Sequence, residues 1–237
     1  MILSLELMPP GKMTADILGG GVEGGRNLQG YPQSVDFSGS GIVVIKYSMI
    51  KPSNRHTSAL RYLSRLGAML NGGVQTIDVP MLVDFITPVA GDGIPSALLA
   101  AGAEFSDGST FGDNSEYAAS LVSGNLASTA DLNAGTVELR VINGREIVGG
   151  EWFSIYHEGR GHRAYRISQV DDAVADGGNM IYTVGIRPTL REAAPVGIEC
   201  RLVRPRCKMR LAPGSSIPFD VERWWESSAE LNFIEAA

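Results

Sequence analysis

The stretch from residue 136 to residue 203 decides the fold: TVELRVINGREIVGGEWFSIYHEGRGHRAYRISQVDDAVADGGNMIYTVGIRPTLREAAPVGIECRLV. Short runs rich in β-branched and aromatic residues alternate in it with turns built from glycine, asparagine and proline. Strands at this spacing are typical of a compact antiparallel β-barrel or β-sandwich. The predicted strands are Thr136–Ile142, Trp152–His157, Tyr165–Val170, Met180–Ile186 and Ile198–Val203, followed by a last strand at Ala229–Ile234.

Residues 41–87 predict a strand, a helix and a second strand. The β-branched run Ile42–Tyr47 indicates a buried strand. Leucines recur every three or four residues in the segment that follows, which predicts one amphipathic helix of about four turns ending at residue 70. Asn71-Gly72-Gly73 then ends the helix through a left-handed cap. The second strand is expected at Val74–Phe85, interrupted by Pro80.

Two further segments lack such a pattern. Residues 11–40 contain glycine clusters, so we expect a loop-like, flexible arm unless a neighbour orders it. Residues 88–133 are rich in small residues and predict an exposed, turn-rich insertion. The expected division is an arm at 1–40, a strand–helix–strand part at 41–87, an insertion at 88–135 and an antiparallel β-barrel or β-sandwich at 136–237. The predicted fold class is mainly β within the α+β class, with one prominent helix.

Composition limits the function classes. The 237 residues suffice for one large β domain or two small ones. The net charge of −6 disfavours nucleic acid as a partner, because an acidic surface repels phosphates. No segment approaches the ~18 apolar residues of a membrane span, and the first ten residues lack the basic region of a signal peptide. We therefore expect synthesis in the cytoplasm, with Cys200 and Cys207 as free, reduced thiols.

Positive charge concentrates between residues 201 and 210. In strand geometry Arg204, Arg206, Lys208 and Arg210 project to one face. Because the chain as a whole is acidic, a solvated strand face or a subunit contact is favoured over nucleic acid. These four residues are the first interface candidates.

Trp224 and Trp225 are the second pair of interface candidates. Adjacent residues of a strand face opposite sides, so one tryptophan enters the core while the other faces outward. An outward tryptophan between Arg223 and Glu226 has the composition of an interface anchor. A platform on which a sugar stacks is the competing interpretation.

A search for catalytic constellations finds none. His157 and His162 are spaced one residue too far apart for a zincin motif, and we expect both on an exposed hairpin loop. Glu151 lacks a partner carboxylate at a predictable separation. A loose calcium-loop pattern from Asp107 has Ala118 where the twelfth position needs Glu. We therefore expect no catalytic residue, no cofactor and no metal.

The order of several motifs resembles the distal tail and minor tail proteins of bacteriophages with long non-contractile tails. The motifs cover mainly 41–87 and 137–237, whereas 11–40 and 88–133 match no pattern of that group. They are Gly149-Gly150-Glu151-Trp152-Phe153, Tyr165-Arg166-Ile167, Ile186-Arg187-Pro188-Thr189-Leu190-Arg191-Glu192, Pro195-Val196-Gly197, Arg204-Pro205-Arg206-Cys207-Lys208-Met209-Arg210-Leu211 and Leu231-Asn232-Phe233-Ile234-Glu235.

The resemblance implies a structural virion protein rather than an enzyme. It implies a homo-oligomeric ring, a hexamer, that caps the tail tube and joins it to the tail-tip hub, next to the tape-measure protein. Ring closure through heterologous contacts would also cover exposed strand edges. Two alternatives stay open: a host-surface carbohydrate-binding module that stacks sugars on Trp225 or Trp152, and a cell-wall hydrolase that uses Glu151.

Overall fold

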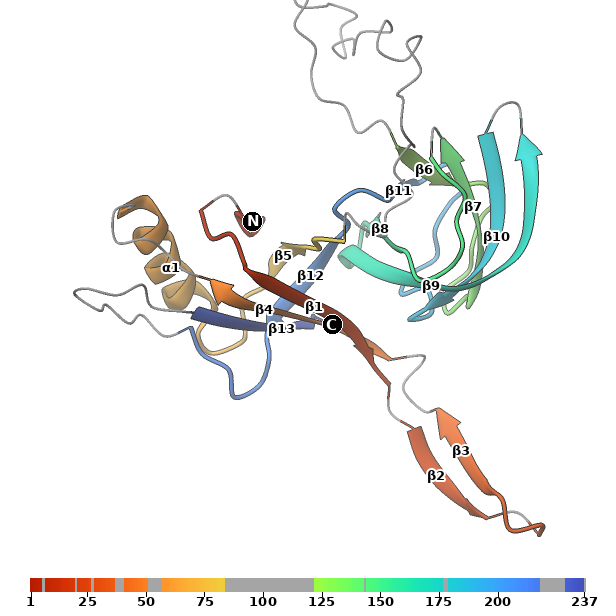
Figure 1. The fold of residues 1–237 in the computed structure, drawn as a ribbon, viewed down its shortest axis with the longest axis horizontal. Coiled ribbons are helices and arrows are strands. Elements are labelled where there is room, and N and C mark those ends of the chain that lie inside the picture. The colour runs from red at the N-terminus through yellow and green to blue at the C-terminus, as the bar shows by residue number, and fades with distance from the viewer. Residues whose placement is uncertain are drawn as a thin grey trace, which may run out of the picture.

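The computed structural model describes residues 1–5, 7–19, 21–26, 28–36, 41–50, 57–83, 122–142, 144–176, 179–217 and 229–236. Over these residues the chain is mostly β, with one helix, as the sequence predicts. The strands form a five-stranded sheet, a closed six-stranded barrel and a two-stranded hairpin (Figure 1).

The five-stranded sheet combines strands from both ends of the chain. All neighbouring strands in it are antiparallel. Its inner face and the helix form one apolar core. In spatial order the strands are β1 (Lys12–Leu18), β4 (Ile42–Ile50), β13 (Ala229–Glu235), β12 (Arg206–Leu211) and β5 (Ile77–Pro80).

The barrel is antiparallel throughout and has its own apolar core. Aromatic residues such as Phe153 and Tyr165 fill it, with ring centroids 5.6 Å apart. Its longest strand has 16 residues and runs from the junction with the sheet to the far end of the barrel (Figure 1). Around the barrel the strands are β10 (Asn179–Arg187), β7 (Thr136–Ile142), β6 (Ser123–Leu126), β11 (Glu199–Arg201), β8 (Trp152–His157) and β9 (Gly161–Asp176).

The helix α1 (Thr57–Leu70), between β4 and β5, confirms the strand–helix–strand order. The second strand is shorter than the expected Val74–Phe85, because β5 spans only Ile77–Pro80. Leu63, Leu66 and Leu70 are buried against the five-stranded sheet. The helix ends at the predicted cap, where Gly72 has φ 101° and Gly73 N donates to Leu70 O at 3.0 Å. A side chain is strained at such a positive φ, which explains why the helix stops here.

The loop-like expectation for residues 11–40 is wrong. β1 pairs with β4 over its whole length, and β2 (Gly21–Arg26) pairs with β3 (Pro32–Asp36) in a hairpin that projects away from the rest of the molecule (Figure 1). Within β1, side chains alternate between exposed and half-buried, as expected for the strand of a sheet with one covered face. The backbone of β4 supplies the order that the glycine-rich sequence lacks.

The expected division of the chain also needs correction. β12 and β13 were expected in the barrel, but they join β4 in the five-stranded sheet. β6 completes the barrel although it comes from the expected insertion. Residues 88–121 of that insertion lie outside the described residues. Sequence separation hides these pairings, because a strand's partner depends on long-range contacts and not on its neighbours in the chain.

Candidate functional site

The outer face of β12 carries the predicted row of cations. Burial alternates along the strand, with Cys207 and Met209 in the core and Arg206, Lys208 and Arg210 turned outward. This follows from the two-residue period of a strand. The row therefore lies on one face, with Arg210 the most exposed of the three.

Arg204 is also exposed, but it does not lie on β12. It precedes β12 and lies at an exposed bend between the buried residues Leu202 and Pro205, with φ 46°. The prediction that Arg204 belongs to the same strand face is therefore wrong. A left-handed backbone at a residue other than glycine is uncommon. Arg204 is exposed at this bend.

Arg201 on β11 adds a fifth cation, close to this bend. Burial lowers its pKa, and the positive charges of Arg206 and Arg204 lower the pKa further. Lys208 lies beside the turn between β8 and β9 of the barrel. A Cβ placed on Gly161 of this turn would lie 3.0 Å from Lys208 Cδ. We call Arg201, Arg204, Arg206 and Lys208 the basic cluster.

Two carboxylates accompany the basic cluster. Asp78 is the cross-strand partner of Lys208 in the pairing of β12 with β5. Glu199 lies two residues before Arg201 on β11. Four cations therefore face two carboxylates, and the surface keeps an excess of positive charge. Such a surface favours a partner that presents carboxylates.

The predicted tryptophans and Glu151 do not form a binding surface among the described residues. Trp224 and Trp225 lie outside the described residues. Trp152 is only 3% exposed in the core between sheet and barrel, with the Arg166 guanidinium 5.9 Å from its ring, so it offers no platform for a sugar. The Glu151 carboxylate accepts hydrogen bonds from the backbone N–H groups of Val148 at 2.9 Å and Gly149 at 2.7 Å. Glu151 therefore stabilises its own turn.

A buried polar network joins the barrel to the end of β13. His157 Nε2 lies 2.8 Å from the Tyr165 hydroxyl, which also accepts a hydrogen bond from Arg191 N at 3.2 Å. Arg191 in turn contacts both carboxylate oxygens of Glu235 at 3.1 Å. The expectation of two histidines on an exposed loop is wrong: His157 is 2% exposed on β8, and His162 is half-buried on β9.

Glu235 is the centre of charge in this network. Its side chain is 6% exposed and lies 3.5 Å from Arg163, whose side chain is 1% exposed. Arg163 also donates to the backbone oxygen of Ala236, and Glu235 accepts from Val43 N at 3.1 Å. Two guanidinium groups and a backbone N–H thus converge on one carboxylate. This network ties β9 of the barrel to β13 and β4 of the sheet.

The network makes stability depend on pH. Burial is the main cause that lowers the pKa of His157, to about 4 from its ordinary 6.5. The unfolded chain therefore binds the proton more tightly than the folded one. We expect the stabilising effect of neutral His157 to be complete above pH 6.5 and to be lost as the pH falls to about 4, by up to ~1.4 kcal/mol per pH unit.

Urea denaturation at pH 7 and pH 5 measures this effect. His157→Gln should show a smaller loss of stability between the two pH values than the wild type. His162→Gln is the control, because His162 on β9 is half-buried and its pKa is lowered less. Equal losses for the wild type and His157→Gln would contradict the assignment.

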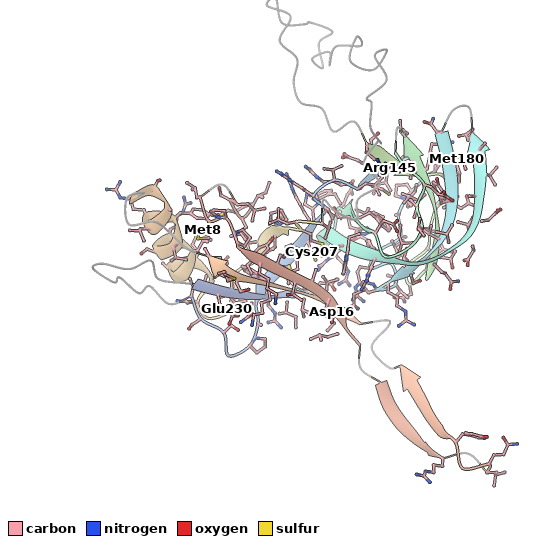
Figure 2. The ribbon with its side chains drawn as sticks, in the orientation of Figure 1. Met8, Asp16, Arg145, Met180, Cys207 and Glu230 are labelled. Carbon is pink, nitrogen blue, oxygen red and sulfur yellow. The ribbon has the colours of Figure 1, made fainter. Side chains whose placement is uncertain are left out.

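A hollow of about 470 Å³ lies where the end of β1 meets the barrel. Asp16, Arg166 and Arg187 bring one negative and two positive charges to its lining. Figure 2 shows Asp16 near the end of the sheet from which the β2–β3 hairpin projects. Arg166 and Arg187 are cross-strand partners of β9 and β10.

Within the described part of the chain, no group of three or more His, Cys, Asp or Glu side chains is arranged to hold a metal ion. Both cysteines are free, as predicted. Cys200 is buried in the barrel core and Cys207 in the sheet core, where burial raises the pKa of the Cys207 thiol to about 12. No helix among the described residues has the length and hydropathy of a membrane crossing.

Comparison with protein-family models and with curated proteins gives no match to this chain.

Proposed function

We propose that this chain is a structural subunit of a bacteriophage tail tip. In this proposal it is assembled in the host cytoplasm, closes into a ring with copies of itself, a hexamer, and connects the tail tube to the tail-tip hub. Its role is adhesion between subunits and to neighbouring tail proteins, without chemistry on a substrate.

The proposal rests on a difference between the two edges of the five-stranded sheet: one edge is covered by another segment of the chain, and the other is open. The β5 edge is covered by the chain's own start: Leu3 N donates to Asp78 O at 2.9 Å, and Asp78 N donates to Met1 O at 2.9 Å. The β1 edge has no second strand beside it among the described residues. An open edge of seven residues offers a row of backbone groups that another chain can pair with.

The β2–β3 hairpin continues from this open edge. Among the described elements, β2 and β3 make their substantial contacts with each other. A two-stranded hairpin is marginally stable by itself in water. Its tip also exposes large side chains, with Leu28 at 108% and Tyr31 at 67% exposure. A projecting hairpin with an apolar tip suits a protein that completes its packing against a neighbour.

The hairpin tip gives a direct test. Leu28→Asp with Tyr31→Asp should abolish closed oligomers, because two carboxylates would replace the apolar contact. Native mass spectrometry and negative-stain imaging at high concentration measure the oligomers. The control is Val196→Asp, which changes a 60% exposed residue on a barrel turn and should leave them intact.

The wild type provides the decisive reference. We expect it to form closed rings and to co-purify with a tail tube protein. A strictly monomeric wild type that is also absent from purified virions would refute the proposed function.

A further inference from the structure

A second charged surface lies on the barrel. There a groove of about 470 Å³ is lined by the bend 128–134 and by parts of β7 and β10. Asp131 and Glu138 bring carboxylates to its lining, and Ser128, Thr136 and Thr183 bring hydroxyl groups; none of its lining residues is basic. Such a lining suits a guanidinium or ammonium group.

The strand register adds further negative charge to this groove. Thr183 of β10 lies opposite Glu138 of β7 on one side and opposite Asp172 of β9 on the other. Directly opposed residues of a sheet share a face, so Asp172 and Glu138 flank Thr183 on the groove side. Both are exposed. We call Asp131, Glu138 and Asp172 the acidic groove.

The basic residue of β7 that lies two positions from Glu138 already forms an ion pair. Arg140 of β7 forms an ion pair of 2.7 Å with Asp176 at the end of β9. Asp171, next to Asp172, accepts a hydrogen bond from Gln169 Nε2 at 2.7 Å and stays exposed. The described residues around the groove therefore keep an excess of negative charge.

The basic cluster and the acidic groove are formed by different residues. The basic cluster adjoins Gly161 at the start of β9, and Asp172 lies eleven residues further along the strand. A contact between the cluster of one copy and the groove of another would therefore join two different surfaces of the chain.

We propose that the basic cluster of one copy docks in the acidic groove of the next copy, and that this contact builds the ring together with the contact proposed for the hairpin tip. The inference rests on the proposed function. Two different surfaces of one chain that complement each other make a heterologous contact, which generates a ring when the rotation closes. The arginines of the basic cluster carry planar guanidinium groups, and such groups pair with carboxylates through two parallel hydrogen bonds.

Charge reversal tests the contact. The first variant is Arg204→Glu with Arg206→Glu, and the second is Glu138→Lys with Asp172→Lys. Each variant alone should weaken self-association on the order of 100-fold, because like charges would then meet across the interface. Sedimentation velocity and native mass spectrometry measure the association, and near-UV circular dichroism checks that both variants are folded.

Mixing gives the sharper result. A 1:1 mixture of the two variants should assemble again, since each contact then joins a native or an exchanged pair of opposite charges. All four substitutions in one chain should restore self-assembly as well. The milder pair Arg204→Gln with Arg206→Gln should give an intermediate weakening. Raising the salt from 0.15 M to 0.5 M should weaken the wild-type contact, as screening requires.

The control reverses two charges elsewhere. Arg61→Glu with Arg65→Glu changes exposed positions of α1 and should leave assembly unchanged. If both reversal variants formed rings as the wild type does, this inference would be overturned and the proposed function would still stand. A wild type that never assembles would overturn both. Binding of DNA by the basic cluster, lost in the first variant without any effect on assembly, would assign the cluster to nucleic acid and also overturn the inference.

Discussion

Glu235→Gln should lower the free energy of unfolding by about 3–5 kcal/mol, the cost of removing one partner from a buried ion pair. Arg163 and Glu235 are both nearly inaccessible, with side chains 1% and 6% exposed. Glutamine keeps the shape and part of the hydrogen bonding but removes the charge. The Arg163 guanidinium would then stay buried without a counter-charge, and Arg191 would lose its ion pair at 3.1 Å.

Urea denaturation followed by circular dichroism measures the loss. The matched control is Glu230→Gln, on the same strand β13 (Figure 2). Glu230 pairs with Lys46 at 2.5 Å, but both side chains are 50% exposed, so the change should cost less than about 1 kcal/mol. If the two variants lost equal stability, the buried network would not hold the barrel to the sheet.

Phe153→Ala should destabilise the fold by about 3–5 kcal/mol, as expected when a buried aromatic ring leaves a cavity. Phe153 is fully buried on β8 and packs on Tyr165 in the barrel core. Tyr165 also bonds His157 and Arg191, so a cavity beside its ring would loosen the polar network as well. Thermal unfolding measured by calorimetry gives the size of the effect.

Tyr156→Ala is the control for this substitution. Tyr156 lies on the same strand but is 56% exposed, with its ring 5.1 Å from that of His162. Tyr156→Ala should lower the free energy of unfolding by less than about 1 kcal/mol, because the exposed Tyr156 side chain buries little apolar area in the folded protein. A loss for Phe153→Ala no larger than that for Tyr156→Ala would contradict the assignment of Phe153 to a close-packed core.

Local patterns predicted the elements where burial alternates strongly along the chain. Trp152–His157 and Thr136–Ile142 were predicted with the bounds that the structure has, and the helix ends at Leu70 as expected. In each case apolar periodicity and a glycine turn point to the same structure. β1 was missed because the glycine clusters beyond residue 18 outweighed the alternation of Met13, Ala15 and Ile17.

The surfaces depend on contacts that no local pattern contains. Lys208 of the sheet lies beside Gly161 of the barrel and opposite Asp78 of β5, and both neighbours are distant from it in the sequence. His157 resembles a loop residue in the sequence, but it is buried because Tyr165 and Arg191 reach it from other strands. Side chains from distant segments create these environments.

The sequence by itself determined a mainly β chain with one amphipathic helix, free cysteines and an outward row of cations on β12. These properties follow from residue type and from the two- and 3.6-residue periods of strands and helices. Tertiary structure alone decided which strands pair, which charged groups are buried around Glu235, and which edge and hairpin stay uncovered. Pairing between distant strands depends on complementary faces and on the entropy of closing long loops. A short stretch of neighbouring residues contains no information about either.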